Sequence, residues 1–410
     1  MRPVTPMAGD ADGQPVAERS VAQLHGVMTE RAVLPGVHRE HLEALVGELG
    51  IPGSADAATP DHAAGRCADD MARGLMVDLL HARIVGWEGV AASAARSVRF
   101  LGTAIRAGTG RARSLREPDG TWVDEDGCEA THGRVLLALG EAIRRVPDPD
   151  LRHEAAVSFA EALPAALEMT GMQARSLVVL ACDAAGRDGG FGSPLAVTYR
   201  RLAASLRRAF EARGYVREWP WPEDSLGQEN GLPAHALIVA GSRLGDADAV
   251  DTGLRALDWL VAVQTVRDGR LSPVGCDGWW PRDGARARFD QRPCDVASLL
   301  LAADAAYRRT ARETYRGVVE HAYAWFLGAN DVGVAVADPE RGACHDRLTP
   351  DGVTPTEGAA ATLTWLTALE HVRALRQLSE TGAPAVGPDG LAGRRLAVRQ
   401  PERRGRATRR

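Results

Sequence analysis

The chain has 410 residues, of which 45% are hydrophobic and 25% are charged, a composition that supports a large buried core. The formal net charge of −5 gives no reason to expect a nucleic-acid partner. All 49 basic residues are arginine, so catalysis by a lysine Schiff base or a lysine general base is excluded.

Both ends of the chain have the composition of disordered tails. Residues 1–20 are rich in Pro, Gly, Ala and Asp without hydrophobic periodicity, and residues 381–410 combine Gly and Pro with many arginines. The N-terminal segment lacks the apolar run of a signal peptide, and no later stretch is apolar enough to span a membrane. We therefore expect a cytoplasmic protein in which residues 21–380 form a single domain.

Apolar residues recur with helical spacing almost throughout the region between the tails. Leu195, Tyr199, Leu202, Leu206 and Phe210, for example, would share one face of a helix. Comparable runs predict helices near residues 38–49, 70–85, 91–107, 133–146, 151–169, 174–185, 195–214, 231–243, 247–264, 293–310, 311–327 and 357–378.

Several helix starts are marked by residues that favour the first turn. Pro194, Pro233 and Pro293 are placed for the first helical turn, and Asp150 and Asp246 are placed for N-caps. No alternating β-branched run is long enough for a central sheet. About twelve helices without a sheet predict an all-α fold, an (α/α)6 barrel built from six helical hairpins.

Four polar segments rich in aromatic residues lie between Trp219 and Thr362, each just upstream of an apolar helical run. Their sequences are WPWPEDSLGQENGLP, SPVGCDGWWPRDGARARFDQRP, WFLGANDVG and CHDRLTPDGVTPTEG. Loops that carry Trp, Asp, Glu and Arg at one end of a helical barrel can form a polar pocket for a sugar. The sequence therefore favours a carbohydrate site at these loops.

Cleavage of a glycosidic bond requires two carboxyl groups, one protonated as general acid and one ionised as base or nucleophile. A helix N-terminus favours the ionised form, whereas burial beside tryptophan raises a carboxyl pKa toward that of an acid catalyst. We predict that Asp290, Glu229 and Glu129 are catalytic. All the candidate carboxyl groups, each at a predicted loop or helix start, are Asp69, Asp70, Glu129, Glu229, Asp290 and Asp346.

These groups also have structural interpretations. Asp69 and Asp70 could cap the helix that follows them, and Glu229 could belong to a turn. Glu129 and His132 are three residues apart, and could share a structural hydrogen bond rather than relay a proton.

Asp290 follows two arginines, Arg286 and Arg288, and the three could form an ion network that binds a sugar. Asp290 could instead cap the helix that begins at Pro293.

The tryptophans divide into two groups by their context. Trp279 and Trp280 are adjacent in a glycine-flanked loop, which favours a stacking surface for a sugar ring. Trp259, Trp325 and Trp365 lie in helical runs and are expected in the core.

Neither a metal nor another cofactor is expected. His345 stands between Cys344 and Asp346, but no second set of ligands is discernible, and the six cysteines lack CxxC spacing.

Six blocks follow one another between about residue 60 and residue 375: GRCADDMARGL, DGCEATHGRVLLALG, WPWPEDSLGQENGLPAHALIVAG, GWWPRDGARARFDQRP, WFLGANDVG and CHDRLTPDGVTPTEGAAATL. Together they resemble a bacterial carbohydrate-active family. Its members often carry a glycosyltransferase name because the region is fused to, or encoded beside, a glycosyltransferase. The resemblance implies a glycosidase-like (α/α)6 barrel and a glycosyltransferase as a potential partner. The substrate-binding residues that we predict are Asp69, Asp70, Arg73, His132, Trp219, Trp221, Asn230, Trp279, Trp280, Arg288, Gln291 and Asp346.

The chain departs from the family pattern within these blocks. Glu229 is one methylene longer than the aspartate of relatives, and Ala360 stands where relatives carry a carboxylate. If that carboxylate is catalytic in relatives, this protein is inactive or altered. Thr354 and Thr356 replace two amides of the same block, and further departures are Met71, Ala130, Arg292 and Asp295.

Two functional classes remain open from the sequence. The first is a carbohydrate-active enzyme, glycosidase-like or phosphorolytic, that acts on an oligosaccharide or glycosylated metabolite through paired carboxylates. The second is a degenerate, non-catalytic sugar-binding protein or scaffold that serves a glycosyltransferase. A helical terpenoid cyclase is disfavoured because the chain has no DDxxD or DxDD run.

Overall fold

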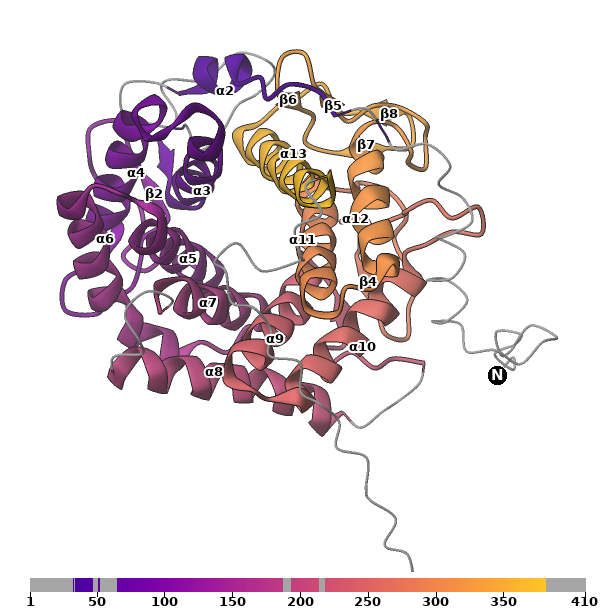
Figure 1. Cartoon of the computed structure of the whole chain (residues 1–410), viewed down its shortest axis with the longest axis horizontal. Coiled ribbons are helices and arrows are strands. Elements are labelled where there is room, and N and C mark those ends of the chain that lie inside the picture. Colours follow the sequence, from indigo (N-terminus) through magenta and orange to yellow (C-terminus); the bar gives the residue numbers. More distant parts are fainter. Residues whose placement is uncertain are drawn as a thin grey trace, which may run out of the picture.

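The computed structural model describes residues 32, 34–46, 51, 65–186, 193–213 and 218–380. Within these ranges the chain is mostly helical, and its helices form two concentric rings (Figure 1). The segments 1–20 and 381–410, for which we predict disorder, lie outside the described residues.

The inner ring closes on itself. Each of its helices packs against the next, and the last packs against the first. Its members are α3 (Ala68–Val85), α5 (Glu129–Arg145), α7 (Met172–Ala185), α9 (Gly231–Leu244), α11 (Pro293–Thr310) and α13 (Ala359–Glu380). The helices that alternate with them and pack outside are α4 (Ala91–Ala104), α6 (Pro149–Ala162), α8 (Ser193–Ala212), α10 (Ala247–Val263) and α12 (Glu313–Phe326). This is the (α/α)6 barrel predicted from the sequence.

The remaining elements are short. The helix expected near 38–49 is only α2 (Glu40–Leu45), which packs against α13. The strands pair in twos and are β1 (Arg66–Cys67), β2 (Leu115–Arg116), β3 (Ser225–Leu226), β4 (Trp280–Pro281), β5 (Ala337–Asp338), β6 (Ala343–Cys344), β7 (Leu348–Thr349) and β8 (Gly352–Val353). Two 3-10 helices are η1 (Trp87–Gly89) and η2 (Leu163–Glu168). None of the helices in the described ranges is both long and apolar enough to cross a membrane.

One predicted cap needs correction. The N-cap of α6 is Asp148, whose Oδ1 accepts the N–H groups of Asp150 at 2.9 Å and Leu151 at 3.3 Å. Pro149 takes the first helical position, where its missing N–H costs nothing, so Asp150 falls inside the first turn. Asp246 caps α10, as predicted.

The core lies between the two rings. On the predicted apolar face of α8, Tyr199 and Leu206 are both 0% exposed. Trp325 and Trp365 are also 0% exposed and Trp259 is 9% exposed, which confirms that these three tryptophans belong to the core.

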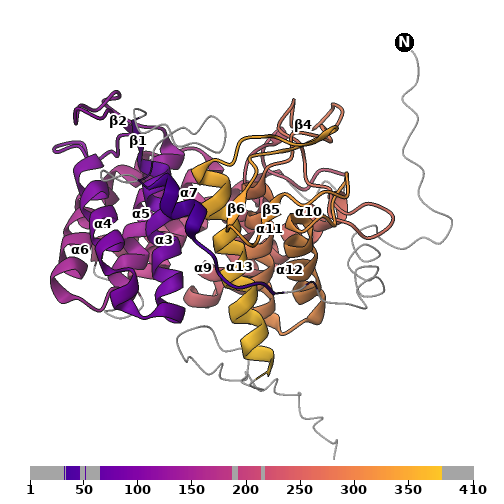
Figure 2. The ribbon, with the colours of Figure 1, turned by 90° about the horizontal axis from the view of Figure 1, so that it is seen from above.

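The inner helices begin at one end of the barrel, which we call the mouth. Asp69 on α3 bonds to Arg134 on α5, and Arg134 and Gln173 on α7 both bond to Glu229, just before α9. All these side chains lie within the first two turns of their helices, so the helix N-termini lie together. Figure 2 shows β1, β2 and β4, which lie in the segments preceding α3, α5 and α11, at the same end. Because helix N-termini carry partial positive charge, the mouth favours ionised carboxylates.

Candidate active site

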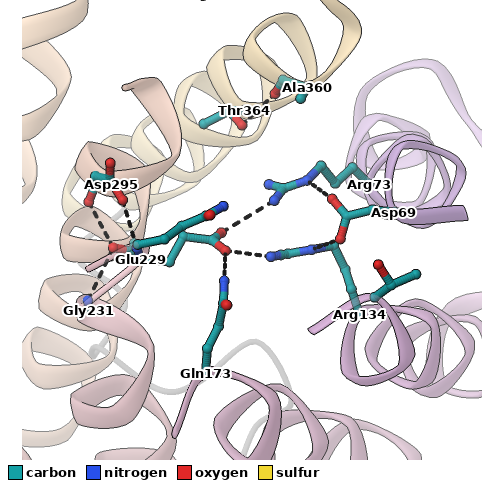
Figure 3. Close-up of polar contacts among 12 residues, drawn as sticks. Asp69, Arg73, Arg134, Gln173, Glu229, Gly231, Asp295, Ala360 and Thr364 are labelled. Carbon is teal, nitrogen blue, oxygen red and sulfur yellow. Dashed lines mark hydrogen bonds and ion pairs between the residues drawn. The ribbon is translucent and has the colours of Figure 1, made fainter. Parts of the chain in front are cut away.

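An ion network crosses the mouth between α3, α5 and Glu229, two residues before α9 (Figure 3). Arg134 on α5 donates from Nε to Asp69 Oδ1 at 2.6 Å and from Nη2 to Glu229 Oε2 at 2.5 Å. Arg73, one turn after Asp69 on α3, donates from Nε to Asp69 Oδ2 at 2.8 Å. Its Nη2 lies 3.5 Å from Glu229 Oε1. These four residues, two carboxylates held by two guanidinium groups, are the mouth network.

Glu229 is the most heavily contacted carboxylate of the mouth network. Besides the two arginines, Gln173 on α7 donates from Nε2 to Glu229 Oε2 at 2.5 Å. Burial alone would raise the pKa of Glu229, but the charges of Arg134 and Arg73 outweigh that effect and the pKa is lowered. Glu229 is therefore ionised at neutral pH, although its side chain is only 5% exposed.

The backbone of Glu229 has a left-handed conformation, with a φ of 51°. Such a conformation costs a non-glycine residue about 1–3 kcal/mol, so the surrounding structure must hold it. Its N–H donates to Asp295 Oδ1 at 2.6 Å, and the N–H of Gly231 donates to Ser298 Oγ at 3.2 Å. The first turns of α11 therefore fix the position of Glu229.

Two further residues of the mouth are left-handed. Trp279 has a φ of 55° and Asp290 a φ of 57°, and both lie in the segment that precedes α11. Gly275, in the same segment, lies so close to Phe289 that an added Cβ would overlap its carbonyl oxygen. Left-handed non-glycine residues cluster at functional sites, so this segment belongs to the candidate site.

Asp70 differs sharply from its neighbour Asp69. Although burial opposes it, the charges of Arg134 and Arg73 lower the pKa of Asp69 to about 2. The Asp70 side chain has no hydrogen bond or ion pair among the described residues, and the residue is 8% exposed. Burial, followed by the charge of Asp69, raises the pKa of Asp70 to about 7. Asp70 is therefore about half protonated near pH 7.

Asp346 lies close enough to Asp70 for its charge to add to this rise in pKa. Its Oδ1 accepts the N–H of Gly358 at 2.9 Å, just before α13 begins. Figure 3 places Ala360 and Thr364 on α13, beyond the mouth network, where Thr364 Oγ1 donates to the Ala360 carbonyl at 2.6 Å. A methyl group thus occupies the position where the resemblance implies a carboxylate.

Glu129 holds the start of α7. Its carboxylate accepts the N–H of Gly171 at 2.8 Å and that of Thr170 at 3.1 Å. Burial alone would raise the pKa of Glu129, but these amides outweigh it and the pKa is lowered. No hydrogen bond joins Glu129 to His132 in the described residues, so the contact proposed between them as one alternative is not formed.

His132 is buried and neutral. Its Nδ1 accepts the N–H of Ala112 at 2.9 Å, and burial lowers its pKa to about 4. The ring therefore anchors the segment between α4 and α5.

Trp219 and Trp221 precede β3 and are 4% and 1% exposed. The ring of Trp219 is edge-on to Trp259 at 5.4 Å and to Trp280 at 5.2 Å, and Trp221 stacks on Trp259 at 6.2 Å. Trp280 is half-buried in this cluster. The half-buried Trp279 carries the guanidinium of Arg292 over its ring at 4.7 Å.

Other predicted site residues bond to their own loop or to the loop that carries Asp331. Asn230 donates to the Gly227 carbonyl at 2.6 Å. Gln291 is 0% exposed and donates to Asp331 Oδ2 at 2.5 Å. Arg288 donates to the other oxygen of Asp331 at 3.0 Å and not to Asp290. Asp290 itself is half-buried.

Three residues of the site were missed by the sequence analysis: Arg134, Gln173 and Asp295. Arg134 stands two residues after His132 in one of the six blocks, so the block carried a signal for it. Gln173 has no such signal, and Asp295 drew notice only as a departure from the family pattern. In the described ranges, no group of three or more His, Cys, Asp or Glu residues is placed to hold a metal.

No protein-family model matches the chain, and no curated protein matches its sequence. Solved structures do share its fold. A sugar epimerase from a ruminal bacterium has a TM-score of 0.61 at 12% identity, covering 86% of this chain and 98% of its own. A cellobiose 2-epimerase from Spirochaeta thermophila has a TM-score of 0.59 at 15% identity, covering 90% and 100%. A GH76 α-mannanase from Bacteroides thetaiotaomicron has a TM-score of 0.52 at 7% identity, covering 89% and 96%. At these identities the likeness establishes the fold.

Proposed function

We propose that this protein is a carbohydrate-active enzyme of the glycosidase-like type, with Asp70 as its general acid and Glu229 as the ionised carboxylate. The observation that carries the proposal is the buried Asp70, which follows Asp69 of the mouth network and has a pKa of about 7. The same network keeps Glu229 ionised. Two carboxyl groups with opposite protonation states in one polar mouth are what glycosidic chemistry requires. The sugar-acting names of the proteins that share this fold support the same class.

In this mechanism each carboxyl group has a defined role. Asp70 gives its proton to the glycosidic oxygen as the bond to the anomeric carbon breaks. Positive charge then develops on the sugar ring, and the ionised Glu229 stabilises it or forms a bond to the anomeric carbon. Arg134 and Gln173 donate hydrogen bonds to Glu229, which stabilise its ionised form and fix its position. Glu229 is therefore a weak base and is poorly suited to abstract a proton from water.

The transferred group has two possible acceptors, water in hydrolysis and phosphate in phosphorolysis. Asp290 remains a proposed alternative for the ionised role because its half-buried carboxylate stands on a left-handed residue at the mouth. Glu129 is proposed as a positioning residue, since it bonds to the backbone that leads to Gln173.

Turnover of neutral oligosaccharides, with and without phosphate, tests the proposal. We expect Asp70→Asn and Glu229→Gln each to lower kcat by about 100-fold or more while sugar binding persists. The wild-type rate should also fall above about pH 7, as Asp70 loses its proton, and Asp70→Asn should abolish that limb. Turnover that survives both substitutions would remove these residues from the chemistry.

A second candidate function is a non-catalytic sugar-binding protein that serves a glycosyltransferase. Two features favour it, because both leave fewer free carboxylates at the mouth than catalysis commonly uses. Ala360 supplies no carboxylate, and the carboxylate of Glu229 is already bound by Arg134, Gln173 and Arg73. Calorimetry on the wild type separates the two functions. If an oligosaccharide binds but is turned over neither with nor without phosphate, the enzyme proposal fails and the binding protein stands.

A further inference from the structure

The segment between α4 and α5 carries a hollow outside the mouth network. Its volume is about 290 Å³. The residues that line it are Arg106, Arg113, Trp122, Val123, Asp124 and Glu125. None of them contacts the mouth network, and none was among the predicted site residues.

Two side chains of the lining are held by contacts within the protein. The guanidinium of Arg113 lies 4.6 Å over the Trp122 ring and donates to the Thr103 carbonyl at 2.7 Å. Asp124, also of the lining, accepts the N–H of Ser114 at 2.7 Å. A ligand in this hollow would therefore find Arg113 and Asp124 already ordered, which lowers the entropic cost of binding, whereas the exposed Arg106 and Glu125 would still have to order.

Short backbone pairings connect the hollow to the mouth. Arg116 of β2 pairs with Arg66 of β1 and also with Trp122. Adjacent strands lie about 4.8 Å apart, so the backbone of Trp122 is on the order of 10 Å from that of Arg66. Figure 2 shows β1 and β2 together at one end of the barrel. Since β1 leads directly into the start of α3 and Asp70, the segment that lines the hollow lies near the mouth.

The chemistry of the lining selects a neutral polar ligand. Two guanidinium groups and two carboxylates leave the lining without net charge. The carboxylates Asp124 and Glu125 would oppose an anion, and the arginines would oppose a cation. The same groups offer both donors and acceptors to the hydroxyl groups of a pyranose ring. Arg113 covers one face of the Trp122 indole, and the rest of the indole adds apolar surface beside these groups.

We propose that the hollow over Trp122 is a distal subsite that binds a neutral sugar ring of an oligosaccharide whose reacting bond lies at Asp70. This inference rests on the proposed function and deepens it, because it makes the substrate an oligosaccharide longer than a disaccharide.

Calorimetric titration with cello-oligosaccharides and α-manno-oligosaccharides, from the disaccharide to the hexasaccharide, tests the subsite. We expect the longest chains of one series to bind about tenfold more tightly than its disaccharide, which corresponds to about 1.4 kcal/mol. Trp122→Ala should remove this increment and leave disaccharide affinity unchanged. An increment that persists in Trp122→Ala, or the absence of an increment in both series, overturns the proposal.

Two controls keep the result interpretable. Trp87→Ala removes another half-buried indole, from η1 beyond the far end of α3, and should retain the increment. Because Trp122 packs on Phe100 at 5.6 Å, its removal can also disturb folding. The double variant Arg106→Ala/Glu125→Ala changes only exposed side chains of the lining and should reduce the increment as well.

Different results would contradict the proposed subsite and the proposed reaction. Asp70→Asn should keep the chain-length increment while turnover is lost. Loss of the increment in Trp122→Ala with turnover of the disaccharide intact would support the subsite by itself.

Discussion

The N–H of Glu229 donates a hydrogen bond of 2.6 Å to Oδ1 of Asp295, a residue 66 positions later in the chain. The bond joins the segment before α9 to the first turn of α11 and holds Glu229 in its left-handed conformation. A residue that the family pattern does not predict thus sets the geometry of the proposed ionised carboxylate.

We expect Asp295→Ala to lower the free energy of unfolding by about 1–3 kcal/mol, because it leaves a buried N–H without an acceptor. It should also lower kcat, since Glu229 loses its fixed position. Asp295→Asn keeps an acceptor oxygen and should restore most of both quantities. Urea unfolding and initial rates measure them, and equal effects of the two substitutions would contradict the positioning role.

Arg134→Ala should destabilise the fold by about 3–5 kcal/mol, because Asp69 and Glu229 then share only Arg73 in a buried place. Combined with Glu229→Gln, the loss should be smaller than the sum of the two single losses. The matched control is Arg99→Ala, which breaks the exposed pair with Glu154 and should cost less than about 1 kcal/mol. Chemical denaturation of the four variants gives the coupling energy, and strict additivity would argue against the network.

Asp70 makes folding stability depend on pH. Its pKa is about 7 in the fold, whereas an unfolded aspartate titrates near about 3.9. Between these values the folded chain holds a proton that the unfolded chain has released. The contribution of Asp70 to the free energy of unfolding is therefore fully present below about pH 4 and is lost as the pH rises through about 7. Its total size is on the order of 4 kcal/mol.

The variant Asp70→Asn cannot ionise and should lack this part of the pH dependence. Relative to wild type, it should be more stable at about pH 8 than at about pH 5. Asp295, whose pKa burial raises to about 6, leaves a smaller slope of the same sign in the variant. Urea midpoints at the two pH values provide the measurement, and parallel profiles of variant and wild type would count against a raised Asp70 pKa.

Gly275→Ala should destabilise the segment that carries Trp279 and Asp290, because the new methyl group would overlap the Phe289 carbonyl. A loss of about 1–3 kcal/mol is expected, as in other overpacked positions. Gly227→Ala is the matched control, since no atom lies within 4 Å of its added Cβ. Thermal unfolding compares the two variants. Similar melting temperatures would show that the segment can shift to accommodate the new methyl group, against the prediction.

Much of the fold was predictable because helix periodicity is a local property. The spacing of Tyr199, Leu202 and Leu206 predicted the buried face of α8, and similar patterns predicted the other long helices. The cap of α6 was misassigned by two residues, since Asp148 and Asp150 both suit a cap and the choice depends on where Pro149 enters the helix.

The site was predictable only in part. The polar blocks drew attention to Asp69, Asp70, Arg73 and Glu229, which the structure brings to one mouth. Their partner Gln173 could not be found in this way, because it contacts Glu229 across 56 positions and no local pattern encodes such a contact.

Asp69 and Asp70 differ in protonation state, a difference that depends on the tertiary structure and not on the local sequence. As adjacent aspartates at a helix start, they are chemically equivalent in the sequence and mark a candidate acidic site. In the fold, Asp69 bonds to Arg134 and Arg73, and its pKa falls to about 2. The carboxyl group of Asp70 is buried without such a bond, and its pKa rises to about 7. Residue type gave both groups the capacity to carry a proton, but burial and distant charges decide which of them holds one at neutral pH.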